Sequence, residues 1–137
     1  MTTVMAFGTF DLLHPGHINF LKQAKKHGDY LIVIIARDRT AKQVKGKSPT
    51  DNERARLKAV RGLNLADKTV LGDKGLNKYG VIKKHRPDTI CLGYDQVTFT
   101  DKLEEKIKDF KLKTKIIRLK AFKPEKYKTS IIKHEKK

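Results

Sequence analysis

Cysteine and tryptophan are almost missing from this sequence, which has one cysteine, Cys91, and no tryptophan. A single cysteine excludes an internal disulfide and is typical of a protein that folds in a reducing compartment, so we expect a cytoplasmic location. A zinc site needs three or four protein ligands. Cys91 and the histidines at 27, 85 and 134 do not have the spacing of such ligands, so we expect no metal site made of protein side chains.

Long apolar runs are missing as well. The longest run extends from Tyr30 to Ala36, which suits a β-strand and is too short to cross a membrane. Residues 1–4 lack the basic start and the apolar core of a signal peptide, so we expect no membrane association. The length of 137 residues corresponds to one domain, 1–137, with one hydrophobic core.

Acidic residues are scarce. Fifteen aspartates and glutamates stand against 32 lysines and arginines, which gives a formal net charge of +17 and predicts attraction to polyanions. Nucleic acid is one such partner, but no RNA-binding signature is present and aromatic side chains do not alternate with the basic runs. The sequence therefore argues against nucleic acid and favours phosphorylated small molecules, with most lysines on the solvated surface.

Apolar, β-branched runs alternate with amphipathic segments along the chain. The pattern predicts strands at 4–7, 30–36, 68–71, 88–93 and 115–119. It predicts helices at 17–26, about 51–60, 76–84, 101–110 and 129–136, and a polar loop at 37–49 with room for a short helix. This alternation indicates an α/β fold: a single Rossmann-like domain with a five-stranded parallel sheet flanked by helices. In such sheets, ligands bind at the carboxyl ends of the strands.

Ten residues join the first predicted strand to the first predicted helix, and they read Gly8-Thr9-Phe10-Asp11-Leu12-Leu13-His14-Pro15-Gly16-His17. The start of a helix offers free backbone N–H groups and the positive end of the helix dipole, both of which suit phosphate. Pro15 and Gly16 allow a tight turn and a close approach of the backbone to a ligand. Imidazoles at this place can donate to phosphate oxygens and stabilise charge that develops during phosphoryl transfer.

This segment resembles the His-x-Gly-His signature of the nucleotidyltransferase superfamily, and the preceding Gly-Thr-Phe-Asp resembles its cytidylyltransferase-like branch. The resemblance implies that His14 and His17 are catalytic and stabilise the transition state at the α-phosphate of a nucleotide. Asp11 has two interpretations, because it can brace the turn or help a divalent cation that bridges the phosphates. The nucleotide-binding residues implied in this segment are Gly8, Thr9, Phe10, Asp11, His14, Pro15, Gly16 and His17.

Three other segments extend the expected site. Asp95, in Gly93-Tyr94-Asp95-Gln96, resembles the acidic residue of the family's Leu-Gly-x-Asp segment, which lies near the nucleotide. Thr129 and Ser130 resemble the Ser/Thr-rich segment at the start of the family's last helix, which suits the β- and γ-phosphates. Basic residues after the second strand suit the acceptor phosphate or the leaving pyrophosphate, and those we select are Lys45, Lys47 and Arg56.

Segments 36–40, 45–49, 70–72 and 92–96 look most similar to the archaeal FAD synthases. That resemblance implies transfer of AMP from ATP to FMN, with release of pyrophosphate and with Mg²⁺ or another divalent cation bound through the substrate phosphates. It also implies that the chain can form a homodimer. The alternative is a CTP-dependent cytidylyltransferase that acts on glycerol 3-phosphate or a similar alcohol phosphate. A basic nucleic-acid-binding module and a nucleotide sensor without turnover are two further alternatives.

Overall fold

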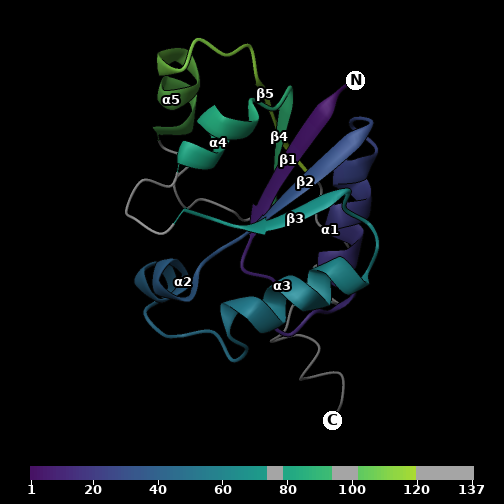
Figure 1. The fold of residues 1–137 in the computed structure, drawn as a ribbon, viewed down its shortest axis with the longest axis vertical. Coiled ribbons are helices and arrows are strands. Elements are labelled where there is room, and N and C mark those ends of the chain that lie inside the picture. Colours follow the sequence, from purple (N-terminus) through teal and green to yellow (C-terminus); the bar gives the residue numbers. More distant parts are fainter. Residues whose placement is uncertain (74–78, 94–101, 120–137) are drawn as a thin grey trace.

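The computed structural model describes residues 1–73, 79–93 and 102–119 (Figure 1). Within these ranges the predicted fold class is confirmed, because five parallel strands form one sheet with helices on both faces. The predicted helix at 129–136 and the predicted site residues Asp95, Thr129 and Ser130 lie outside the described residues. Among the described helices, none has the length and apolar character needed to span a membrane.

The strands have the bounds β1 (Thr3–Gly8), β2 (Tyr30–Ile35), β3 (Lys68–Leu71), β4 (Thr89–Leu92) and β5 (Lys115–Arg118). The helices have the bounds α1 (Pro15–Lys25), α2 (Asp38–Lys45), α3 (Glu53–Gly62), α4 (Gly80–His85) and α5 (Leu103–Asp109). The polar segment 37–49 thus contains a helix, α2. Helix α1 begins two residues before the predicted start, because His14 is its N-cap and Pro15 fits the first helical position.

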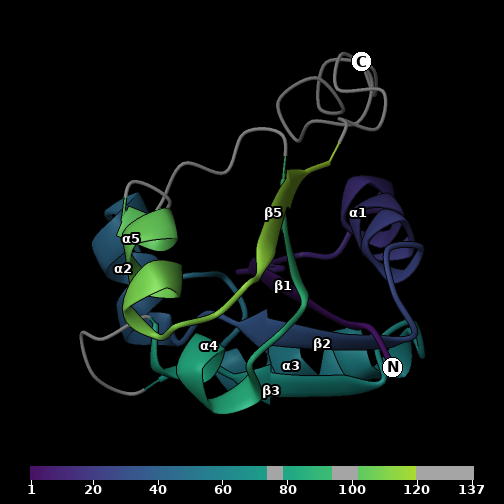
Figure 2. The same ribbon diagram turned by 90° about the horizontal axis from the view of Figure 1, so that it is seen from above.

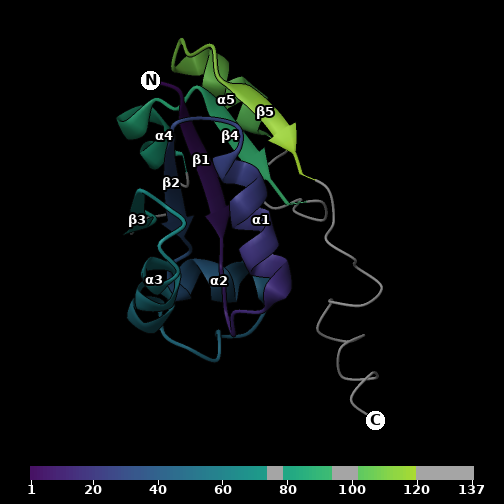
Figure 3. The same cartoon turned by 90° about the vertical axis from the view of Figure 1, so that its right-hand side faces the viewer.

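The strand order is β3-β2-β1-β4-β5, with parallel pairing throughout. The chain builds the sheet outward from β1 in one direction and then returns to add β4 on its other side. The carboxyl ends of β1 and β4 therefore lie side by side at the switch point, where α/β sheets bind ligands. Figure 3 shows α2 and the start of α3 near this end of β1.

Two apolar clusters cover the two faces of the sheet. Side chains of α1 and α3, such as Leu21 and Leu57, pack on one face, while Ile82 of α4 and Leu103 of α5 pack on the other. Figure 2 shows α1 on one side of the sheet and α4 and α5 on the opposite side. Because both faces are buried, β2 is apolar along nearly its whole length instead of alternating with polar residues.

Candidate active site

The loop between β1 and α1 is folded tightly around the ring of Phe10. This side chain is 4% exposed, packs against Phe20 and meets the ring of His17 edge-on at a centroid distance of 5.6 Å. Phe10 and Leu12 both have positive φ, 54° and 52°, a conformation that costs energy for residues with a side chain. A Cβ atom on Gly8 would lie 2.6 Å from the Phe10 ring, which accounts for glycine at the end of β1.

The two histidines make reciprocal contacts at the start of α1. Nδ1 of His14 accepts from the backbone N–H of Gly16 at 3.0 Å, and Nδ1 of His17 accepts from the backbone N–H of His14 at 3.3 Å. Their rings are stacked, with centroids 3.9 Å apart. Because both Nδ1 atoms are acceptors, the proton of each neutral ring belongs on Nε2. The pair is therefore in the tautomer that can donate from Nε2 to phosphate oxygens.

Burial supports the neutral form of His14. Desolvation lowers the pKa of His14 below its ordinary value of 6.5, so at neutral pH this ring is a hydrogen-bond donor without a net charge. The ring folds back over Gly16, where a Cβ atom would lie 2.8 Å from Cε1 of His14. Glycine at position 16 is thus required by the close approach of the His14 ring.

Asp11 contacts the segment before α3. Its Oδ2 accepts from the backbone N–H of Thr50 at 2.7 Å, and its Oδ1 accepts from the backbone N–H of Asp51 at 2.9 Å. Of the two roles considered for Asp11, these contacts favour bracing of the turn. Among the described residues, no three histidine, cysteine, aspartate or glutamate side chains are grouped so that they could hold a metal ion.

Arg56 is turned into the protein. It is 1% exposed, and its guanidinium donates to the carbonyl of Thr9 at 2.8 Å, to the carbonyl of Asp51 at 3.0 Å and to Oδ1 of Asp38 at 2.7 Å. The sequence predicts a phosphate contact for this residue, whereas these bonds commit three guanidinium N–H groups to protein oxygens. The charged partner in this network, Asp38, is a residue that we did not select from the sequence.

The other predicted residues lie at the end of α2, in the loop after it and at the start of α1. Lys47 is exposed in the loop between α2 and α3, and Lys45 is the last residue of α2. Pro15 is the first residue of α1 and is exposed. The described structure therefore brings together the segment from Gly8 to His17 and the start of α3.

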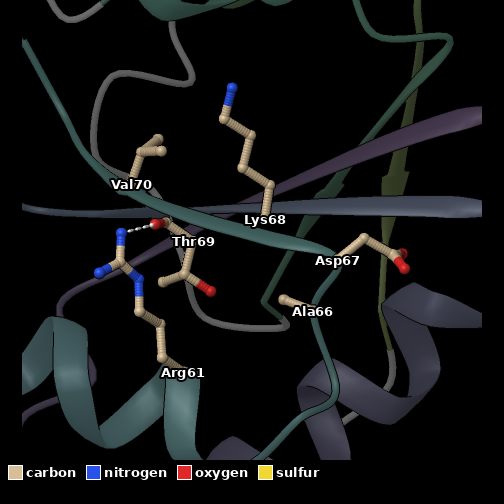
Figure 4. A pocket seen from close by; sticks show the side chains of 6 residues that line it. All are labelled: Arg61, Ala66, Asp67, Lys68, Thr69 and Val70. Atoms are coloured by element: carbon tan, nitrogen blue, oxygen red, sulfur yellow. Dashed lines mark hydrogen bonds between the residues drawn. The ribbon is translucent and has the colours of Figure 1, made fainter.

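A cavity of about 320 Å³ lies elsewhere, beside the edge strand β3 (Figure 4). Two of its charged side chains are engaged within the protein: Arg61 donates to the carbonyl of Thr69, and the carboxylate of Asp67 accepts from Lys25 and from the backbone N–H of Leu31. Asp67 precedes β3, at the amino edge of the parallel sheet, whereas the histidine turn lies at the carboxyl edge. This cavity is separate from the candidate active site. Six residues line it: Arg61, Ala66, Asp67, Lys68, Thr69 and Val70.

Comparison with known proteins gives a family match over most of the chain. Residues 5–135 match the profile of the cytidylyltransferase-like family. FAD synthase of Aciduliprofundum boonei is 44% identical over 122 residues, which cover 89% of this chain and 80% of that protein. FAD synthase of Archaeoglobus profundus is 46% identical over 122 residues, which cover 88% of this chain and 76% of that protein.

Solved structures show the same fold. A Thermoplasma volcanium protein described as a lipopolysaccharide core biosynthesis protein superposes with a TM-score of 0.82 at 41% identity, over 89% of this chain and 98% of that chain. A pantoate-beta-alanine ligase from Francisella tularensis superposes with a TM-score of 0.62 at 17% identity, over 97% of this chain and 65% of that chain. The second similarity concerns the fold alone.

Proposed function

This chain belongs to the cytidylyltransferase-like family, and from that premise we propose that it is an FMN adenylyltransferase, an FAD synthase that transfers AMP from ATP to FMN. The observation that carries the proposal is the stacked pair His14 and His17 at the start of α1. This histidine pair occurs in a chain that is 44–46% identical to two archaeal FAD synthases, over most of this chain and most of each relative. We infer the reaction class from the family and the substrates from these relatives.

The reaction is an in-line displacement at the α-phosphorus of ATP. An oxygen of the FMN phosphate forms the new bond to this phosphorus, and the bond to the bridging oxygen of pyrophosphate breaks. A phosphate monoester is already an anionic nucleophile, so the protein contributes mainly positioning and charge stabilisation. The Nε2–H groups of His14 and His17 donate to the non-bridging oxygens of the α-phosphate, where negative charge grows in the transition state.

The remaining contacts are proposed from the sequence. Asp95 accepts from the ribose or the base, and Thr129 and Ser130 hold the β- and γ-phosphates. Lys45 and Lys47 meet the acceptor phosphate or the pyrophosphate. Arg56 acts on this site from within the protein, through the carbonyl of Thr9.

A divalent cation such as Mg²⁺ fits this site as part of the substrate complex. Mg²⁺ is commonly held by substrate phosphates with one or two carboxylates, and the described residues offer no cluster of three ligands. When bound, the cation neutralises charge on the phosphates of the leaving group. We also propose that the protein works in the cytoplasm. We further propose that it forms a homodimer, and size-exclusion chromatography with light scattering would test this oligomeric state.

The decisive experiment measures pyrophosphate release with ATP or CTP crossed with FMN or glycerol 3-phosphate, in the presence of Mg²⁺. We expect turnover with ATP and FMN, accompanied by quenching of flavin fluorescence as the adenine joins the flavin. CTP should be a much poorer donor, and the His17→Ala variant should be inactive. Turnover with CTP and glycerol 3-phosphate but not with ATP and FMN would overturn the proposal in favour of a cytidylyltransferase.

A further inference from the structure

Two adjacent residues after β2 pair with two residues on the first turn of α3. Arg37 pairs with Glu53, with 3.1 Å between Nη1 and Oε2, and Asp38 pairs with Arg56, with 2.7 Å between Oδ1 and Nη2. Glu53 also accepts from the backbone N–H of Asp38 at 2.9 Å. Because residues three apart lie on the same face of a helix, the two pairs together connect the start of α2 to the start of α3.

This double ion pair reaches the histidine turn through Arg56. The guanidinium that pairs with Asp38 also donates to the carbonyl of Thr9, which directly follows β1. Two residues further along, Asp11 accepts from backbone N–H groups at 50 and 51, immediately before α3. The loop that leads to His14 is therefore fastened to the segment 50–56 at two points.

The loop needs such anchoring because its backbone is strained. Phe10 and Leu12, on either side of Asp11, both have positive φ, and such residues keep this conformation when their surroundings impose it. Arg56 suits the task because its planar guanidinium can reach several oxygens at once, whereas a lysine ammonium on a flexible stem cannot match that geometry. The side chain of Arg56 is fully buried, which strengthens these bonds.

We propose that Arg56 is a positioning residue for the catalytic histidines and that Asp38 orients its guanidinium. The pair holds the carbonyl of Thr9 so that the loop delivers His14 and His17 in their stacked arrangement. This inference rests on the proposed function for its kinetic test. It gives a role to Asp38, which belongs to one of the segments that resemble the archaeal FAD synthases.

The test compares Asp38→Asn and Arg56→Lys with the control Asp67→Asn. Like Asp38, Asp67 accepts from a cationic side chain, in this case Lys25, but it lies at the opposite edge of the sheet. For Asp38→Asn we expect kcat of FAD formation to fall about tenfold or more, since small misplacements of reacting groups have effects of this size. Both KM values should stay within about twofold. Arg56→Lys should lose more activity, and Asp67→Asn should match the wild type.

A second measurement needs no substrate. Nitrogen-15 NMR spectra report the tautomer and surroundings of the imidazoles of His14 and His17. We expect these signals to move in Asp38→Asn and to stay in place in Asp67→Asn. The carboxylate of Asp38 is 41% exposed, so Asp38→Asn decides the question even if Arg56→Lys fails to fold.

Two results overturn the positioning role. A higher KM for ATP or FMN at unchanged kcat would make Arg56 a substrate ligand. A folded Asp38→Asn protein with unchanged kcat and unchanged imidazole signals would show that the turn does not depend on this pair. If the wild type makes no FAD, the proposed function fails, and the NMR comparison still decides whether Arg56 and Asp38 position the histidines.

Discussion

The imidazole rings of His14 and His17 are stacked, with planes inclined by 26°, and the backbone N–H of His14 donates to the ring of His17. The two residues are not equivalent in this arrangement. The ring of His14 caps α1 through the N–H of Gly16, in addition to presenting its Nε2. His17 lies in the first turn of α1, and its Nδ1 completes a capping box by accepting from the backbone N–H of His14 instead of from an N–H group of the helix. Substitutions can therefore separate the structural role of His14 from its chemical role.

Substituting either histidine should nearly abolish turnover while the fold persists. His17→Ala removes one Nε2–H donor, and loss of one such donor typically lowers kcat by about 10²–10³. His14→Asn should lose a similar factor, although asparagine is a good N-cap and can still accept from the N–H of Gly16. Pyrophosphate release and circular dichroism of the two variants check this. Turnover near that of the wild type in either folded variant would contradict the catalytic assignment.

The matched substitution His14→Ala tests the cap itself. It removes the Nε2 donor and the capping acceptor together, so it should be less stable than His14→Asn by about 1 kcal/mol, the usual value of an N-cap. Urea unfolding of the two variants measures the difference. Equal stability of the two proteins would indicate that the ring of His14 does not cap α1 in solution.

Stability should depend on pH through His14. Burial lowers its folded-state pKa below 6.5, so its contribution is fully present above pH 6.5 and is lost as the pH falls through the folded-state pKa. Between these two values the unfolded chain binds the proton and the folded protein does not. The wild type should therefore lose more unfolding free energy than His14→Asn between neutral pH and about pH 5.5. Burial lowers the pKa of His85 as well, but His85 contributes equally to both proteins.

Activity should follow the same titration. The acid limb of the kcat/KM profile, which reports groups of the free enzyme, should have its midpoint below pH 6.5, because protonation of His14 requires Nδ1 to give up the N–H of Gly16. Pyrophosphate release across this range measures the midpoint. A midpoint at or above 6.5 would be incompatible with a buried, neutral His14.

Adding one methyl group at Gly16 should impair catalysis. In Gly16→Ala the new Cβ would lie 2.8 Å from Cε1 and 3.0 Å from Nδ1 of His14, so the ring must move. We expect kcat to fall about 10- to 100-fold, as for other small displacements of catalytic groups. Gly62→Ala is the control, because its Cβ would have no heavy atom within 4 Å. The control should keep full activity and gain about 0.5–1 kcal/mol of stability.

The strands could be predicted from the sequence because burial on both faces makes them apolar and β-branched. The predicted range 68–71 coincides with β3, and 115–119 differs from β5 by one residue. Helix α2 was harder to predict, because its eight residues carry little apolar pattern and its first turn depends on Glu53, a residue distant in sequence. Such long-range partners leave no local signal.

In the site, too, the features with a local sequence signal could be predicted, and those that depend on distant residues could not. The segment from Gly8 to His17 could be recognised because phosphate chemistry needs its residues in a fixed local order. Helical spacing places Arg54 and Arg56 on different faces of one helix, but it does not reveal what lies opposite each face. The carbonyl of Thr9 and the carboxylate of Asp38 decide the orientation of Arg56, and both come from other parts of the chain.

Asp95 lies outside the described residues, and its role is predicted from its position shortly after β4 in the sequence and from the resemblance of its segment to the family's Leu-Gly-x-Asp. Asp95→Ala should raise the KM for ATP more than it lowers kcat, because a contact to the ribose or base is remote from the reacting phosphorus. Steady-state kinetics at varied ATP and saturating FMN measures both constants. An unchanged KM for ATP would place Asp95 outside the nucleotide site.

Turnover should require a divalent cation that binds with the nucleotide and not to the protein alone. Among the described residues no three potential ligands are grouped, and Asp11 already accepts two backbone N–H groups. Removal of divalent ions with EDTA should abolish FAD formation, and added Mg²⁺ or Mn²⁺ should restore it. Electron paramagnetic resonance of Mn²⁺ should show weak binding to the protein alone and tight binding once ATP is present. Tight stoichiometric binding of Mn²⁺ without ATP would contradict this, and its loss in Asp11→Asn would return Asp11 to the role of a metal ligand.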